Sequence, residues 1–186
     1  MTMPTGFPVS DEVLMQRISA GDQSAFSELL GRHSRRFYAA AYRLVLNRED
    51  AEDVVQDAFC KLWNGKAKWH DDRGAKFTTW FYRIVTNQAL DLLAKRRNQM
   101  GGTLDEEIPS GEPDAEDNLL AARQTDAMAA ALATLPERQR TAVVLFYNEE
   151  LSQKEAAEVM GLTVKAVESL LGRAKQALKE RMRIYA

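Results

Sequence analysis

The stretch 151–179 constrains the fold more than any other, because it carries the signals of two helices joined by a tight turn. Ser152 and Glu155 have the spacing of a capping box, in which each side chain accepts a hydrogen bond from the backbone N–H of the other residue. Gly161 tolerates the left-handed conformation that often ends a helix, and Thr163 can cap the helix that follows. The stretch therefore predicts a helix-turn-helix.

The second helix of this pair separates an apolar side from a polar and cationic side on a 3.6-residue wheel. A helix of this size fits the major groove of DNA, where such side chains reach base edges and phosphates. The residues that we expect on this DNA-reading face are Lys165, Glu168, Ser169, Gly172, Arg173 and Gln176. On this stretch alone, an ordinary helical hairpin with a solvated face remains the alternative.

Acidic residues are concentrated in the middle of the chain. The 186 residues carry a formal net charge of −2, and residues 98–118 hold seven Asp or Glu and no Lys or Arg. This segment also holds three glycines and two prolines and has no apolar period, which indicates a flexible acidic linker. We therefore predict an all-α chain of two small helical domains, 1–97 and 119–186, of which the second is the helix-turn-helix domain.

Composition argues against several other classes of protein. No run approaches the ~20 apolar residues of a membrane span, and the first ten residues lack the basic start and apolar core of a secretory signal. We therefore expect a cytoplasmic protein without membrane insertion. One cysteine and two histidines leave no metal-ligand cluster, so we expect no metal or cofactor. The sequence offers neither a nucleophile with its base nor a phosphate-binding glycine loop, which argues against an enzyme.

The helix predicted from Glu49 to Trp63 has a wide apolar arc, and its opposite face carries carboxylates, an amide and a thiol. Such an acidic row suits docking on a basic protein surface, whereas a merely solvated helix more often carries mixed Lys and Glu pairs. The residues on this face are Asp53, Gln56, Asp57 and Cys60. Docking and simple solvation both remain open on these residues alone.

The basic loop 64–76 and the helix predicted after it combine cations, aromatic rings and polar side chains. A site for unstacked single-stranded bases needs this combination, since rings stack on bases and donors reach base edges and phosphates. The side chains expected off the core side of this helix are Thr79, Trp80, Tyr82, Arg83, Thr86 and Asn87. Taken alone, such aromatic residues are more often part of a core or its rim.

Four arginines lie off the apolar stripe of the helix predicted over 26–44. They could meet phosphates or an acidic partner surface, and a solvated charged face is the alternative. They are Arg32, Arg35, Arg36 and Arg43.

The segments DAEDVVQDAFCKLW, FTTWFYRIVTNQALD and, after the acidic linker, LSQKEAAEVMGLTVKAVESLLGRAKQAL follow one another in this order. Together they resemble the extracytoplasmic-function (ECF) sigma factors of bacterial RNA polymerase, and the resemblance covers nearly the whole chain from Asp22 onward. It implies a first domain that binds the beta-prime clamp helices of core RNA polymerase and melts the minus-ten promoter element. It implies a second domain that reads the minus-thirty-five element, and regulation by an anti-sigma factor.

The resemblance also assigns roles to residues. The face of Asp53, Gln56, Asp57 and Cys60 would dock on the polymerase, and the linker would enter the polymerase channels, where its acids imitate phosphate. The DNA-reading face would contact the upstream promoter element. The minus-ten site would comprise Lys68, Arg73, Lys76, Thr79, Trp80, Arg83 and Asn87.

One departure from the family concerns the DNA-reading face. Many relatives carry arginines where this chain has Glu168 and Leu170, and Gly172 stands where a larger residue is frequent. A carboxylate in the groove prefers a cytosine amino group and repels phosphate, so the usual promoter consensus does not transfer to this chain.

Two alternatives to a promoter-recognising sigma factor remain. A sigma mimic would titrate an anti-sigma factor without binding DNA, and we would expect it to lack cationic and aromatic residues such as Trp80, Arg83 and Arg173, which this chain keeps. A stand-alone helix-turn-helix regulator would account for the second domain and leave the first without a role.

The domain assignment predicts the pattern of limited proteolysis. Exposed backbone that lacks packing partners is cut before packed helices. A protease of broad specificity should therefore cut within 98–118 first and leave two resistant fragments, which mass spectrometry identifies. Early cleavage inside 26–44 would contradict the assignment.

Overall fold

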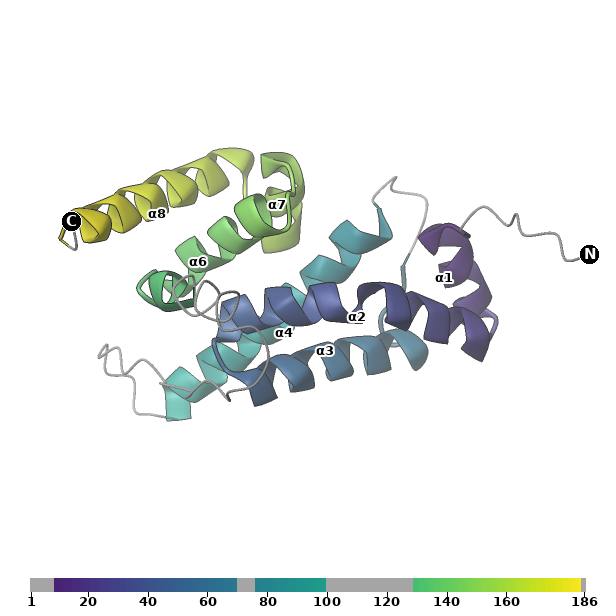
Figure 1. Ribbon diagram of the computed structural model, residues 1–186. Coiled ribbons are helices and arrows are strands. Elements are labelled where there is room, and N and C mark those ends of the chain that lie inside the picture. The colour runs from purple at the N-terminus through teal and green to yellow at the C-terminus, as the bar shows by residue number, and fades with distance from the viewer. Residues whose placement is uncertain (1–8, 70–75, 100–128, 185–186) are drawn as a thin grey trace, which may run out of the picture.

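The computed structural model describes residues 9–69, 76–99 and 129–184, and the regular secondary structure of these ranges is helical throughout. In chain order, the helices are α1 (Asp11–Ser19), α2 (Gln23–Val45), α3 (Arg48–Trp63), α4 (Phe77–Gln99), α6 (Glu137–Val143), the π-helical turn η2 (Val144–Asn148), α7 (Gln153–Met160) and α8 (Val164–Ile184). Figure 1 shows two groups of helices, α1 to α4 and α6 to α8, and the second group lies against α2 and α4 of the first. The predicted all-α fold with a C-terminal helix-turn-helix is confirmed.

Local hydrogen bonds form the turn of the helix-turn-helix as the sequence predicts. The Ser152 hydroxyl accepts the Glu155 N–H at 3.2 Å, and the Glu155 carboxylate accepts the Ser152 N–H at 2.9 Å. Gly161 ends α7 with φ +62°, in the left-handed region that favours glycine. The Thr163 hydroxyl then accepts the N–H of Ala166 at 3.2 Å. Residues at the turn itself therefore help to set the angle between α7 and α8.

Aromatic rings from three helices form the centre of the first group. Phe37 of α2 has no exposed surface, and its ring centroid lies 4.5 Å from that of Phe81 and 4.8 Å from that of Tyr82, both on α4. Phe59 of α3 lies 4.7 Å from Phe81. Because each ring contacts rings from other helices, α2, α3 and α4 are fixed against one another.

Two apolar side chains, one near the start of α1 and one at the start of α8, are exposed and not packed in a core. Val13 is 43% exposed and Val164 is 40% exposed. Each lies in the first turn of its helix, where the preceding chain offers little packing surface. In α1 the buried arc consists of Leu14, Met15 and Ile18 instead.

Helix α4 continues to Gln99, so the first two residues of the predicted linker are its last two helical residues. The rest of the linker, and the beginning of the second predicted domain, lie outside the described residues. Residues 129–133 are helical and lead into α6. The boundaries 1–97, 98–118 and 119–186 therefore stay predictions.

Truncating the central ring of the aromatic core tests the packing. Phe37→Ala should lower the free energy of unfolding by about 3 to 5 kcal/mol, because it removes a fully buried ring. Urea unfolding followed by circular dichroism measures this change. Tyr147→Ala is the control, since Tyr147 is 60% exposed, and its loss should change the same quantity by less than about 1 kcal/mol. Equal losses would contradict the assigned core.

Candidate functional site

The predicted DNA-reading face of α8 is open to solvent. Buried Val167, Leu171 and Ala174 hold the opposite side of the helix against the second core. The residues of the face are all exposed: Lys165, Glu168, Ser169, Gly172, Arg173 and Gln176. Packing of the opposite side of the helix therefore presents this row of polar side chains outward.

Two features of this face bear on how it can approach DNA. Arg173 donates from Nη2 to the Ser169 hydroxyl at 3.1 Å, which orients its guanidinium along the helix surface. A Cβ atom added at Gly172 would meet nothing within 4 Å, so the fold itself does not require glycine there. The missing side chain leaves room for a base edge or a phosphate to approach the backbone.

The predicted docking face of α3 is also exposed at each of its four positions, Asp53, Gln56, Asp57 and Cys60. Beside it, a groove of about 540 Å³ runs between α2 and α3. We call this the docking groove, and it is lined by Phe26, Leu30, Ser34, Arg35, Tyr38, Glu52, Val55, Gln56, Phe59, Cys60, Trp63 and Asn64. Two of the four predicted docking residues, Gln56 and Cys60, are part of this lining.

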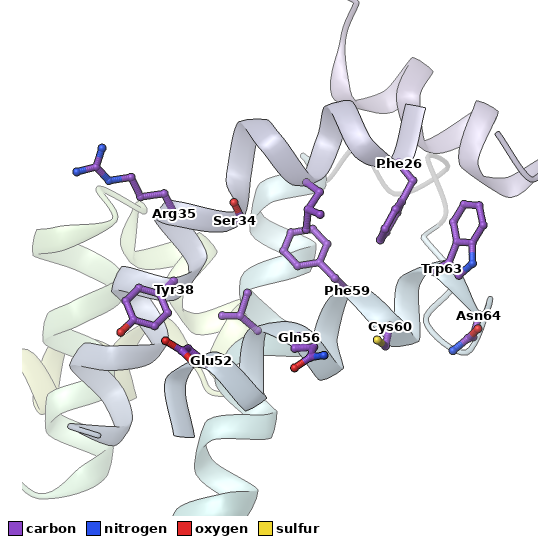
Figure 2. A pocket seen from close by; sticks show the side chains of 12 residues that line it. Phe26, Ser34, Arg35, Tyr38, Glu52, Gln56, Phe59, Cys60, Trp63 and Asn64 are labelled. Carbon is purple, nitrogen blue, oxygen red and sulfur yellow. The ribbon is translucent and has the colours of Figure 1, made fainter. Parts of the chain in front are cut away.

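Figure 2 shows how the side chains of the docking groove are arranged. Phe26 and Trp63 lie at one end and Tyr38 and Glu52 at the other, with Phe59 between them. The ring centroids of Phe26 and Trp63 are 5.0 Å apart, and Trp63 keeps 41% of its surface exposed. A groove with aromatic walls and polar groups at its margin can accept apolar side chains of a partner. The sequence did not predict this groove, although Trp63 at the end of the apolar arc was a signal for it.

The predicted minus-ten residues of α4 form a row along one side of the helix. Lys76, Trp80, Arg83 and Asn87 follow one another at spacings of three and four residues, which puts them on the same face. Lys76, Arg83 and Asn87 are exposed, as is Lys68 in the preceding loop, while Trp80 is half-buried. The Trp80 ring packs against Phe77 and Phe81 and is fixed in position. Arg73 lies outside the described residues.

Thr79 is not exposed as the sequence predicted. It is buried, at 3% exposure, and its hydroxyl donates to the Glu155 carboxylate of α7 at 3.4 Å. Tyr82 and Thr86 are buried too, although we expected them off the core side of α4. Thr79 and Tyr82 are buried by tertiary packing, because the α6 to α8 group lies on this side of α4.

A buried carboxylate joins the two groups of helices. Glu149, just after η2, is 4% exposed, and its partners lie on α2 and α4. Arg36 donates from Nε to the carboxylate at 3.2 Å and from Nη2 to the Glu149 carbonyl at 3.0 Å. Tyr82 donates its hydroxyl to the same carboxylate, and Arg43 Nη1 lies 3.6 Å from it. We call these four residues the Glu149 cluster.

The electrostatics of the Glu149 cluster are consistent with its burial. Burial and the bond to Glu149 raise the pKa of the Tyr82 hydroxyl well above its ordinary value, so the hydroxyl remains a donor. The Arg36 guanidinium lies 5.5 Å from the centroid of the Tyr82 ring, a cation–π distance. Two of the four arginines that the sequence placed off the α2 stripe thus meet an acidic surface, and that surface belongs to the same chain. Arg32 instead pairs with Asp11 and Glu28 in its own group.

Two further observations concern membrane spans and metal ions. Within the described ranges, no helix combines the length and the apolar character needed to cross a bilayer. The same residues contain no group of three or more His, Cys, Asp or Glu side chains that could hold a metal ion.

Two family models match the chain on either side of the acidic segment. The model of sigma-70 region 2 matches residues 29–99, and the model of sigma-70 region 4 matches residues 125–178. The first range contains the docking face and the α4 row, and the second contains the helix-turn-helix. The docking face, the α4 row and the DNA-reading face of α8 therefore all fall inside matched regions.

Relatives and solved structures match nearly the whole chain. The ECF RNA polymerase sigma-E factor of Escherichia coli strain K12 is 31% identical over 184 residues, which cover 94% of this chain and 95% of the relative. The structure of CnrH in complex with the cytosolic domain of CnrY matches with a TM-score of 0.71 and 30% identity, over 95% of this chain and 99% of that one. The sigma factor RpoE in complex with the anti-sigma factor NepR from Bartonella quintana matches with a TM-score of 0.66 and 25% identity, over 86% and 97%.

Both sigma-70 regions lie in one chain, and a relative above 30% identity is matched over almost its full length. The chain therefore belongs to the sigma-70 family of RNA polymerase sigma factors and, within it, to the ECF sigma factors.

Proposed function

We propose that this sigma factor binds core RNA polymerase through the docking face and the docking groove, melts the minus-ten element at α4 and reads the minus-thirty-five element with α8. It would act in the cytoplasm, and by binding rather than by catalysing a reaction. The observation that carries the proposal is the presence, on one chain, of an open apolar groove beside an acidic helix face and of an exposed, partly cationic face on α8.

The docking step rests on the chemistry of α3. Exposed Asp53 and Asp57 attract a basic surface before contact, and such attraction mainly raises the association rate. The aromatic walls of the docking groove then offer apolar area to the beta-prime clamp helices, and its burial mainly slows dissociation. Gln56 and Cys60 lie between these two parts, where they would contact the partner directly.

The reading of the upstream element rests on the row of polar side chains along α8. Arg173 can form two hydrogen bonds to the edge of a guanine, and Glu168 can accept one from the amino group of a cytosine. Lys165 lies one turn before Glu168, near the start of the helix, where a cation reaches phosphate. The remaining polar positions, Ser169 and Gln176, would complete the contact surface.

The melting of the minus-ten element rests on the α4 row. The half-buried ring of Trp80 offers a fixed surface on which a flipped base can stack, a contact worth about 1 to 3 kcal/mol per base. Arg83 and Asn87 continue the row along the helix, where they can bind phosphate and a base edge. Lys68 and Lys76 would contribute positive charge at its start, and Arg73 belongs to the same proposed site.

Regulation by an anti-sigma factor is part of the proposal. RpoE, to which this chain is similar, was solved with the anti-sigma factor NepR. The match to CnrH in its complex with CnrY extends over both groups of helices. A sigma mimic remains the second candidate, and the exposed cations and the stacking ring at the DNA sites argue against it.

A charge reversal on the docking face tests the first step. Asp53→Arg should weaken binding to core polymerase at least about tenfold, because it removes an acceptor and adds repulsion against a basic surface. Asp91→Arg is the control, since it makes the same change at an exposed position on α4. Fluorescence anisotropy with labelled protein measures the affinity, and circular dichroism checks helicity. Equal affinities of the two variants would remove Asp53 from the docking surface.

Removal of one cation from α8 tests the upstream contact. Arg173→Ala should reduce transcription from a promoter that depends on the minus-thirty-five element by about 5- to 150-fold, which corresponds to about 1 to 3 kcal/mol for a bidentate base contact. Lys95→Ala is the control, because it removes an equal charge from an exposed position on α4, outside α8. In vitro transcription with core polymerase provides the measurement. A similar loss on a promoter with a scrambled upstream element would show that Arg173 acts through phosphate or folding.

A further inference from the structure

We propose that Asp11 on α1 and His33 on α2 are positioning residues of the minus-ten site. They act through the first residue of α4 on the ring of Trp80. This inference deepens the proposed function and rests on it, because it concerns the surface on which a flipped base would stack. The match to sigma-70 region 2 begins at residue 29, so α1 lies outside it. The inference gives this first helix a role in promoter melting.

The two oxygens of the Asp11 carboxylate bind neighbouring residues of α2. Oδ2 lies 2.7 Å from Nε2 of His33, and because a carboxylate can only accept, this ring nitrogen carries a hydrogen and donates it. Oδ1 accepts from Nη1 of Arg32 at 3.1 Å, and the same nitrogen donates to the Val9 carbonyl at 2.5 Å. The side chain of His33 keeps only 13% of its surface exposed. The orientation of its imidazole is therefore set by a carboxylate that is itself held in place.

The imidazole of His33 packs against the first residue of α4. Its ring centroid lies 5.5 Å from that of Phe77 and 5.7 Å from that of Phe37. Phe77 is 1% exposed and lies in the first turn of α4, where backbone N–H groups lack partners within the helix. Side-chain packing therefore does much to fix this end of the helix, and His33 is part of that packing.

The ring of Trp80 packs on the same aromatic residue. Its centroid lies 6.0 Å from that of Phe77 and 6.1 Å from that of Phe81, and these two phenylalanines lie 5.4 Å apart. Because Trp80 is only half-buried, part of its ring remains available to a base. Stacking depends on how two rings overlap, so a shift of Phe77 that displaces the Trp80 ring weakens the contact with the base.

The charge of Asp11 predicts an effect on DNA binding opposite to that of its position. Removal of a carboxylate makes the chain more positive, and general attraction to phosphates would then strengthen binding. The positioning role predicts weaker binding, because the imidazole loses its acceptor. The direction of the change therefore separates the two effects.

The test measures how the holoenzyme, formed with core polymerase, binds single-stranded DNA. The probe is a labelled oligonucleotide with the non-template minus-ten sequence of a promoter that the wild-type holoenzyme transcribes, and fluorescence anisotropy gives the affinity. Asp11→Ala should weaken binding at least about threefold, as part of the contribution of one stacked base. His33→Gln should weaken it similarly, since it keeps a donor for Asp11 and removes the ring from Phe77.

Two further variants serve as controls. Asp11→Asn keeps an oxygen that can accept from His33, and Glu12→Ala removes a carboxylate from the neighbouring position in the same turn of α1. Both should stay within about twofold of the wild-type affinity. All variants should keep the helicity of the wild type in circular dichroism and its affinity for core polymerase. Should Asp11→Ala lose helicity, His33→Gln takes its place.

A double-mutant cycle shows whether Asp11 acts through Trp80. Trp80→Ala should weaken binding of the oligonucleotide at least about fivefold, because it removes the stacking surface. Asp11→Ala should then add no more than about a further twofold loss, since no ring is left to position.

The outcomes separate this inference from the proposed function. Wild-type affinity of Asp11→Ala, or a loss that is equal with and without Trp80, would overturn the positioning role. An unchanged affinity of His33→Gln would overturn the step through Phe77. If Trp80→Ala binds the oligonucleotide as tightly as the wild type does, the minus-ten site itself is wrong, and the positioning role with it.

Discussion

The burial of the Glu149 carboxylate holds the two groups of helices together. An ionised group removed from water needs several donors close by, and Glu149 finds them in Arg36, Arg43 and Tyr82 of the other group. Of these three, Tyr82 also contacts the aromatic core through Phe37. The position of the helix-turn-helix is thereby tied to the same rings that hold α2, α3 and α4 together.

The helices of the first group divide their surfaces between internal and external partners. The outward side of α3 and the groove beside it stay open, with Trp63 partly exposed at one end. One side of α4 is covered by α7 through Thr79, while the row that contains Arg83 and Asn87 remains exposed. Access to the docking groove therefore needs no change in the packing of the helices, because its lining lies on α2, on α3 and at the residue after α3.

The sequence predicted what local chemistry determines. The capping box at Ser152, the turn at Gly161 and the exposed faces of α3 and α8 depend on residues within one or two turns of one another, and all of them are found. The docking groove depends on how α2 packs against α3, which brings Phe26 to within 5.0 Å of Trp63 between ring centroids. The burial of Thr79 and the pairing of Arg36 with Glu149 depend on contacts between residues more than seventy positions apart. No helical period carries that information, so the charged stripe on α2 was visible in the sequence and its partner was not.

The charge of the chain explains why the two DNA sites have to work together. With a formal net charge of −2, the chain cannot gain much affinity for duplex DNA from general attraction to phosphates. In the proposed function, Glu168 on α8 would oppose phosphate, and discrimination would come from a few directed contacts such as one from Arg173, whose guanidinium donates to the Ser169 hydroxyl. A few such contacts give selectivity but weak binding. Fixing both sites on one polymerase supplies the missing affinity through effective concentration, because the second contact then forms within a single complex. In the structure, the Glu149 cluster holds the second group of helices against α2 and α4 of the first.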